Sequence, residues 1–127
     1  MHKNIHTIVI GGLNTDIIAS GVNKIIGKGE QTYGKRLQIG PGGKSRNIAQ
    51  MIAILSDKKT VAMIGKTSID PFQLWKPPVQ ALEKAGVNID FVQQLAFEET
   101  KQFPAAALIS VDKNGNNQIY ILPGITN

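Results

Sequence analysis

The chain has 127 residues, of which 42% are hydrophobic and 18% are charged, a balance typical of one globular domain and unlike a disordered or fibrous protein. It has no cysteine and only two histidines, His2 and His6, which excludes a disulfide framework, a thiolate nucleophile, cysteine-bound zinc and a histidine-rich metal site. The formal net charge is +5, and no apolar run could form a membrane span or a signal-peptide core, so we expect a cytoplasmic protein without membrane contacts.

The first predicted element is a buried strand over residues 5–10, because this short run is rich in β-branched residues and ends at Gly11-Gly12. Such a strand near the start of a chain typically opens an α/β sheet. Residues 17–39 follow a different pattern, with apolar stretches on either side of a turn at 27–30. We therefore expect a two-stranded antiparallel excursion there instead of a crossover helix.

The apolar period changes after Gly40-Pro41-Gly42-Gly43, which we expect to end the excursion. The next apolar residues are spaced as on the face of a helix that packs on a sheet: Ile48, Met51, Ile52 and Leu55. We expect this helix to end at Ser56-Asp57 and a second buried strand to follow over residues 60–64.

A second helix is predicted to start at Asp70-Pro71, since a capping carboxylate followed by proline is typical of a helix start. Pro77-Pro78 should break or kink it, because neither residue donates a backbone hydrogen bond. Gly86 suits the position after its last turn, and a third strand is expected over residues 87–92. The order strand–helix–strand–helix–strand predicts a parallel sheet with right-handed crossovers.

The last predicted elements are strands at residues 105–111 and 118–122, which flank a turn at 112–116 with the Asn-Gly signature of a hairpin. The fold class is therefore α/β, with half of a parallel sheet and two antiparallel excursions, 17–39 and 105–122. We expect both excursions to pair into one small flap over the edge of the sheet.

Two glycine-rich segments fall short of nucleotide-binding motifs. Residues 11–14 follow a strand but contain no G-x-G-x-x-G, and Gly43-Lys44-Ser45 ends like a P-loop whose first glycine is replaced by Gln38. A degenerate P-loop stays open as an alternative. Nucleic-acid binding is the least favoured function: residues 1–66 hold ten Lys and Arg against three acidic residues, but no arginine-rich stripe with interleaved aromatic residues is visible, and a solvated basic surface is the simpler interpretation.

Asn14 and Asp16 are the first candidate binding residues, because they follow the first strand at the end where open α/β sheets bind ligands. Side chains two residues apart in an extended chain point the same way. A carboxylate and a carboxamide on one face suit a polyol, whose hydroxyl groups donate and accept hydrogen bonds. An Asx turn that leaves the strand is the structural alternative.

Gly42, Gly43, Lys44 and Asn47 form the second candidate group. The glycines let a ligand approach the backbone, and the helix that follows presents unpaired N–H groups at the same place. Lys44 adds a donor, and Asn47 lies one turn further along the same face. Each residue alone is compatible with a plain helix N-terminus, whereas all four together with the acidic strand end favour a binding site.

These two groups of residues resemble the N-terminal signature of the ribokinase-like (PfkB) carbohydrate and nucleoside kinases. The similarity lies in residues 11–16 (Gly-Gly-Leu-Asn-Thr-Asp) and 40–47 (Gly-Pro-Gly-Gly-Lys-Ser-Arg-Asn). Further similarity follows in order along the chain, at residues 65–70, 86–87, 109–121 and 123–124. Ser45-Arg46 depart from the family, which mostly has small residues there, and this departure bears on the choice of substrate.

The resemblance implies an ATP-dependent kinase, acting with Mg²⁺, that phosphorylates a hydroxymethyl group of a sugar. The positions that match the family's sugar-binding residues are Asn14, Asp16, Gly42, Gly43, Lys44 and Asn47. Residues 1–16 and 40–100 would form the sheet with its helices. Strands within 17–39 and 101–122 would form a lid over the sugar and, in some members, a dimer surface, with an apolar contact from Phe103 or Ala107.

The family's other motifs, a Gly-Ala-Gly-Asp loop with the catalytic aspartate and an Asn/Glu metal motif, have no match in residues 1–127, nor has its ATP site. Asp16 is placed to hold substrate and not to remove a proton. We therefore expect the sugar-binding N-terminal part of a kinase, inactive alone, in which no catalytic, cofactor-binding or metal-binding residue is identified. The alternatives are a nucleoside kinase of the same family and a non-catalytic binding or assembly module.

Overall fold

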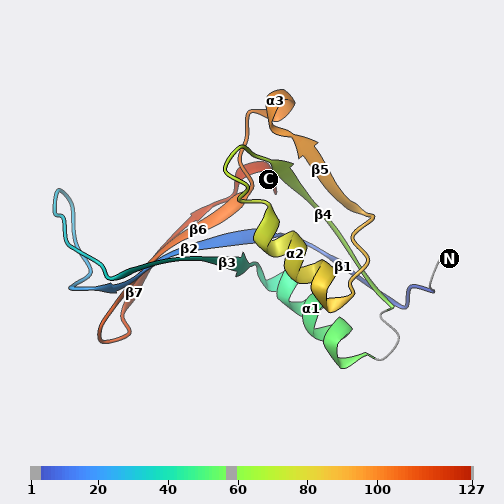
Figure 1. The fold of residues 1–127 in the computed structure, drawn as a ribbon, viewed down its shortest axis with the longest axis horizontal. Helices are drawn as coiled ribbons and strands as arrows, with labels where there is room; N and C mark the ends of the chain where they lie inside the picture. The colour runs from blue at the N-terminus through green and yellow to red at the C-terminus, as the bar shows by residue number, and fades with distance from the viewer. Residues whose placement is uncertain (1–3, 57–59, 127) are drawn as a thin grey trace.

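The computed structural model, which describes residues 4–56 and 60–126, contains two sheets (Figure 1). The body sheet is parallel, with strand order β1-β4-β5, and its strands are β1 (Thr7–Ile10), β4 (Val61–Ile69) and β5 (Val92–Ala96). The lid sheet has strand order β3-β2-β6-β7, and its strands are β2 (Asn14–Val22), β3 (Arg36–Gly42), β6 (Ala105–Asp112) and β7 (Asn117–Leu122). The predicted α/β class with a parallel sheet is confirmed.

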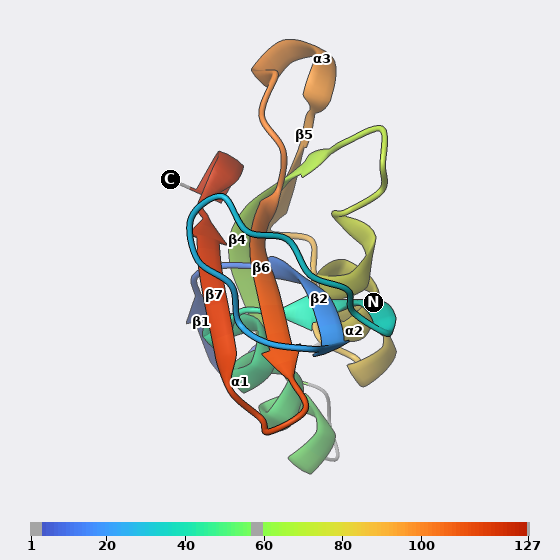
Figure 2. The same cartoon turned by 90° about the vertical axis from the view of Figure 1, so that its left-hand side faces the viewer.

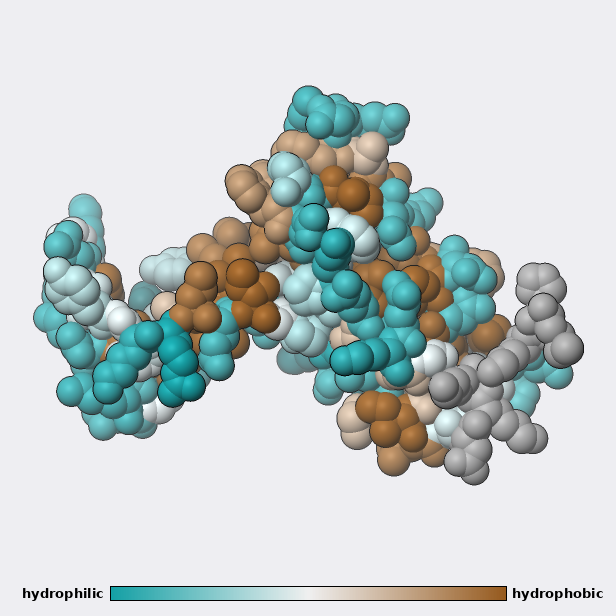
Figure 3. Space-filling model, in the orientation of Figure 1, coloured by the Kyte–Doolittle hydropathy of each residue, from teal (hydrophilic) through white to brown (hydrophobic). Residues whose placement is uncertain are grey.

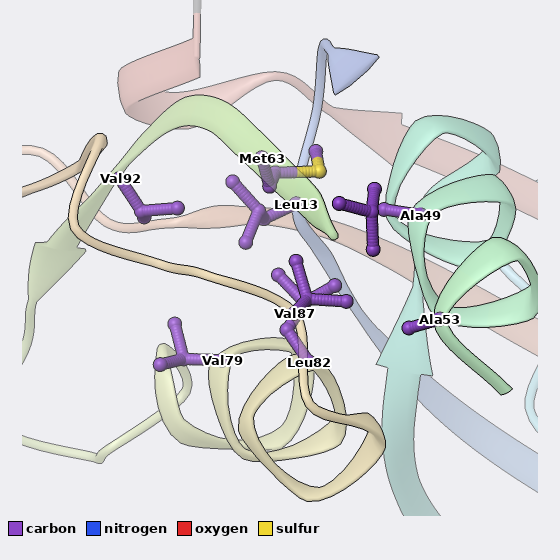
Figure 4. Packing of buried hydrophobic residues seen from close by; sticks show 9 residues of the cluster. Leu13, Ala49, Ala53, Met63, Val79, Leu82, Val87 and Val92 are labelled. Carbon is purple, nitrogen blue, oxygen red and sulfur yellow. The ribbon is translucent and has the colours of Figure 1, made fainter. Parts of the chain in front are cut away.

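Two helices cover one face of the body sheet. They are α1 (Lys44–Leu55) and α2 (Lys76–Ala85), and the shorter α3 (Phe97–Thr100) and η1 (Gly124–Thr126) lie elsewhere. Alternate residues Val61 and Met63 of β4 point toward the helices, as the two-residue period of a strand requires. The core between the sheet and the helices (Figure 4) is formed by Leu13, Ala49, Ala53, Val61, Met63, Val79, Leu82, Val87 and Val92.

The first strand is present, but the expectation that it is buried is wrong for one of its faces. Val9 packs against the core, whereas Ile8 and Ile10 are 58% and 73% exposed. Among the described residues, β1 pairs with β4 alone, so its other edge has no neighbouring strand. The space-filling view shows apolar side chains exposed among hydrophilic ones over the body of the molecule (Figure 3).

The predicted flap is confirmed as the lid sheet. β2 and β3 are antiparallel, β6 and β7 form the predicted hairpin, and parallel pairing of β2 with β6 joins the two excursions (Figure 2). One detail differs from expectation. Gly40-Pro41-Gly42 belongs to β3 instead of ending the excursion before it. Asn14 and Asp16 follow the first strand as expected and lie in the extended strand β2. The ladder with β2 extends both strands because it pairs their backbone groups.

The predicted buried face of α1 is wrong. The helix buries Arg46, Ala49 and Ala53, while Ile48, Met51 and Leu55 are exposed and Ile52 is half-buried. α1 contacts α2 as well as β1 and β4. The small side chains of Ala49 and Ala53 allow the two helices to approach closely. The spacing of apolar residues in the sequence does not indicate this contact.

The start of α2 also differs from expectation. The carboxylate of Asp70 accepts hydrogen bonds from the backbone N–H of Phe72 at 3.1 Å and of Trp75 at 3.2 Å, but it caps a turn, and the helix begins at Lys76. Pro77-Pro78 therefore neither break nor kink α2, because they lie in its first turn, where no backbone N–H is needed. The predicted cap at Gly86 is confirmed by its left-handed conformation, with φ of 89°.

The third strand is shifted toward the C-terminus. Of the predicted range 87–92, Asn88 makes an isolated parallel bridge with Ala62, and β5 starts at Val92. His2 and Asp57, named above, lie outside the described residues. In the part of the chain that the structure describes, no helix is long and apolar enough to cross a membrane, and no three His, Asp or Glu side chains are grouped as metal ligands.

The exposed face of β1 predicts self-association. We expect the apparent mass in multi-angle light scattering to rise with protein concentration, because Ile8 and Ile10 lie beside an unpaired strand edge. The double variant Ile8→Thr/Ile10→Thr, which keeps β-branched side chains, should reduce this rise. Ile119→Thr/Ile121→Thr on β7, an equally exposed pair of β-branched residues, is the matched control. A wild-type protein that stays a compact monomer at high concentration would contradict the prediction.

Candidate functional site

The register of the lid sheet brings the two predicted groups of residues together. In the β2–β3 ladder Asn14 lies opposite Gly42, and Asp16 lies opposite Gly40. Residues paired across a ladder project to the same face, so Asn14 and Asp16 share the face of Gly42, as the extended chain predicts. On the other side of β2, small side chains lie beside them, with Ala105 opposite Asn14 and Ala107 opposite Asp16.

Glycine is required where the loop before α1 meets this strand. A Cβ atom on Gly42 would lie 2.7 Å from Cγ of Asp16, inside van der Waals contact. At Gly43 the φ angle is 95°, and a Cβ would lie 2.8 Å from the carbonyl oxygen of Gly12. Any larger side chain would therefore separate the Asp16 carboxylate from the start of α1.

Unpaired backbone donors lie at the start of α1. No side chain caps this helix, and the backbone N–H groups of Gly43, Lys44 and Ser45 have no acceptor among the described residues. The N–H of Asn47 donates to the carbonyl of Gly43 at 3.0 Å. Together with the partial positive charge of a helix N-terminus, such N–H groups favour oxygen-rich or anionic ligands.

The side chains of Lys44 and Asn47 are exposed on the first turn of α1. They follow the glycines directly in the chain, but in the described part of the structure neither makes a hydrogen bond or ion pair with Asn14 or Asp16. The structure thus places Asn14, Asp16, Gly42 and Gly43 next to one another. The side chains of Lys44 and Asn47 lie nearby but are exposed to solvent.

Burial sets the ionisation of Asp16. Desolvation raises the pKa of its carboxyl above the ordinary value, and the nearby Arg46 guanidinium lowers it in part. The described residues donate no hydrogen bond to the Asp16 carboxylate and form no ion pair with it within 4.0 Å. Its oxygens are therefore available to a ligand.

Arg46 is the site residue that sequence reasoning missed. It is buried, and its Nε donates to the carbonyl oxygen of Gly42 at 2.8 Å. The sequence marked it as a departure from the family pattern without assigning it a place. An arginine in the first turn of a helix, three residues after a glycine pair, is the signal that could have been used.

Of the two apolar residues expected at the site, Ala107 lies beside Asp16, whereas Phe103 packs elsewhere. The ring of Phe103 is stacked on Phe72, with 6.0 Å between ring centroids, and contacts Phe97 at 4.9 Å. An open hollow of about 810 Å³ adjoins the site at the end of β1, where Gly11 and Gly12 line it with Ile10, Ile64 and Phe91 among others.

The family model for the pfkB family of carbohydrate kinases matches residues 4–127. Among solved structures, the fold is similar to ribokinase from Thermotoga maritima, with 26% identity, a TM-score of 0.77, and coverage of 94% of this chain and 37% of that one. No curated protein sequence matches the chain significantly.

Two further structures differ in what they contain. Ribokinase from Arabidopsis thaliana, solved with ribose and ATP, is 24% identical with a TM-score of 0.77, over 96% of this chain and 37% of that one. The nucleoside kinase of Burkholderia thailandensis, solved with inosine, is 19% identical with a TM-score of 0.70, over 93% of this chain and 35% of that one. The chain spans about a third of the length of these solved structures.

The raised pKa of Asp16 predicts that its charge destabilises the fold. A carboxyl whose pKa is higher in the folded than in the unfolded state gives a stability that falls as pH rises through that raised pKa. We therefore expect Asp16→Asn to raise the melting temperature at pH 7 and to flatten its decline between acid and neutral pH, measured by calorimetry.

Asp112→Asn is the matched control for this experiment. Its carboxylate accepts hydrogen bonds from the backbone N–H groups of Asn114 and Asn116, both at 2.9 Å, so the same chemical change should lower stability there. A lower melting temperature for Asp16→Asn would show that its carboxylate stabilises the fold and would contradict the prediction.

Proposed function

The chain belongs to the pfkB family of carbohydrate kinases, and we propose that it is the sugar-binding part of an ATP-dependent kinase that phosphorylates a sugar hydroxymethyl group. One observation carries the proposal. The free carboxylate of Asp16 packs against Gly42, beside the unpaired N–H groups at the start of α1. Acceptors and donors are thereby placed within the reach of one small molecule.

A polyol fits this arrangement better than a phosphate does. Hydroxyl groups donate to the Asp16 carboxylate and accept from the N–H groups of Gly43 and Lys44, and the carboxamide of Asn14 does both. An anionic phosphate beside Asp16 would be repelled by its charge. We therefore propose that Asn14, Asp16, Gly42, Gly43, Lys44 and Asn47 bind the sugar and that the phosphate donor binds elsewhere.

The lid sheet supports the proposal through its shape. Ala105 and Ala107 leave space beside Asn14 and Asp16, so a ligand can lie between the lid face and α1. A sheet over the sugar would exclude water, which otherwise competes as phosphoryl acceptor. We propose that strands within 17–39 and 101–122 act as the cover over the sugar. Residues 1–16 and 40–100 would act as the body, which then includes the ends of β2 and β3 that carry the candidate binding residues.

The phosphate donor proposed for the whole kinase is ATP, with Mg²⁺, and the proposed compartment is the cytoplasm. Among the described residues no group of His, Asp or Glu could hold a metal ion, so the residues present do not fit a magnesium site. The chain's own part in the reaction is to bind and orient the sugar and to exclude water.

A nucleoside is the second candidate substrate, because its ribose offers the same hydroxyl groups. The apolar hollow adjoins the site at Gly12, whose carbonyl oxygen lies next to Gly43, and it favours a nucleoside because a nucleobase requires an apolar surface next to the sugar pocket. The same residues would then hold the ribose, and the base would distinguish the two substrates.

We also propose a homodimer through the outer lid face, defined as the lid face opposite Asp16. Leu37 and Ile39 of β3 share this face with Leu108 of β6 and Tyr120 of β7, which lie opposite each other, and all four side chains are exposed. An apolar sheet face of this kind is stable when a second copy covers it. If Leu37→Thr/Ile39→Thr leaves the light-scattering mass of the protein unchanged while Ile8→Thr/Ile10→Thr lowers it, this dimer is not formed.

Ribose binding tests the proposed site. We expect isothermal titration calorimetry to detect D-ribose binding to the 127-residue chain and Asp16→Asn to weaken it roughly 10- to 100-fold, the effect of one lost charge-assisted hydrogen bond. Glu99→Gln, at an exposed carboxylate on α3, is the control and should leave affinity unchanged. Equal affinity for ribose in wild type and Asp16→Asn would show that Asp16 does not bind the sugar. Stronger binding of inosine than of ribose would favour the nucleoside.

Phosphoryl transfer gives the second test. We expect no turnover when these 127 residues alone are incubated with ATP, Mg²⁺ and a panel of pentoses, hexoses and nucleosides. The described residues place no second carboxylate near Asp16 to act as a general base. Product formation above the background without protein, measured by coupled ADP release, would overturn this expectation.

A further inference from the structure

Arg46 is buried in an electrostatically unfavourable place. It is the third residue of α1, where a cation meets the positive end of the helix dipole, and no acidic residue lies in that first turn. Only 6% of its surface is exposed, and this burial lowers the pKa of its guanidinium, with Asp16 offsetting part of the effect. A charge kept where burial and the dipole both oppose it indicates a role beyond packing.

The contacts of Arg46 orient the peptide between Gly42 and Gly43, which connects β3 to α1. Its Nε donates to the carbonyl of Gly42 at 2.8 Å, and its Nη1 donates to Oε1 of Gln50, one turn along α1. In a planar trans peptide the C=O and N–H groups point in opposite directions. By holding the Gly42 carbonyl, Arg46 therefore directs the N–H of Gly43 to the opposite side, where no described residue accepts from it.

The positive charge of Arg46 also stabilises the ionised carboxylate of Asp16 without binding its oxygens. The Asp16 carboxylate packs against Gly42, the residue whose carbonyl Arg46 holds, and Arg46 is the one charged group among the described residues that favours ionised Asp16. No ion pair within 4.0 Å joins the two side chains in the described structure. A direct salt bridge would use carboxylate oxygens that a ligand needs, whereas a charge at longer range does not.

We propose that Arg46 is a positioning residue for polyol binding, which presents the Gly43 N–H to the ligand and supplies a counter-charge for Asp16 while leaving both carboxylate oxygens free. The inference rests on the proposed sugar-binding function and deepens it. It assigns a role to the residue that departs from the family's small side chains. The ligand that fits is a neutral polyol with neighbouring hydroxyl groups.

The test uses three variants of the 127-residue chain and two measurements. Carbon-13 NMR follows the titration midpoint of the Asp16 carboxyl without ligand, and calorimetry measures D-ribose affinity. Arg46→Met should raise the midpoint and weaken ribose binding at least about tenfold, because positive charge and peptide orientation are both lost. Arg46→Lys should keep the midpoint near the wild-type value but regain only part of the affinity, since lysine lacks the planar Nε donor.

Arg36→Met is the control for net charge. Arg36 is exposed and lies opposite Ser20, further along β2 from Asp16, so this variant should change neither the midpoint nor the affinity. If Arg46→Met does not fold, Arg46→Lys decides instead: wild-type affinity in the lysine variant would overturn the role assigned to the Gly43 peptide.

The two measurements separate failure of the inference from failure of the proposed function. If wild type binds ribose and Arg46→Met binds it equally well, the inference is overturned and the sugar site stands. If wild type binds neither ribose nor inosine, the proposed function fails. The NMR titration of the Asp16 carboxyl, which needs no ligand, still tests whether Arg46 acts on Asp16. In that case an unchanged Asp16 midpoint in Arg46→Met would overturn the inference.

Discussion

The candidate site depends on the register between β2 and β3. With Asn14 opposite Gly42 and Asp16 opposite Gly40, the carboxylate of Asp16 meets a position that has no side chain. Because side chains alternate along a strand, a slip of one residue would turn Asp16 to the outer lid face and bring Thr15 to the site. Thr15 is fully buried and donates to the carbonyl of Leu74, which ties β2 to the body and opposes such a slip.

Asp16 and Arg46 stabilise each other's charge only in part, because they do not form an ion pair within 4.0 Å in the described structure. Burial disfavours the charge on both Asp16 and Arg46, and each offsets part of the cost for the other. The helix N-terminus adds a positive field that favours the carboxylate and disfavours the guanidinium. A closed ion pair would occupy carboxylate oxygens that a ligand could otherwise bind. The observed arrangement suits a site that must exchange one set of hydroxyl groups, those of water, for those of a sugar.

Local sequence signals predicted the features that local chemistry decides. The Asn-Gly hairpin, the Gly86 cap, the strand–helix order and the glycine-rich loop were all found in the structure. The errors arose where distant contacts decide. The face of α1 is chosen by its approach to α2, which favours Ala49 and Ala53 over the larger Ile48 and Met51. Arg46 could not be placed, because its role depends on a strand pairing that the apolar period does not encode.

Anchoring explains why the binding residues lie at the near end of the lid. Leu13 is fully buried in the core, Thr15 is tied to Leu74, and Arg46 holds Gly42, so both β2 and β3 are fixed where they meet the body. Farther out, the β2–β6 ladder shifts register between Ser20 and Val22, and the strands carry exposed side chains on both faces. Positional precision is therefore concentrated at Asn14, Asp16 and Gly42. The end of the lid sheet far from the body has none of these contacts among the described residues, so it can adapt to a ligand or a second copy without displacing the groups proposed to hold the sugar.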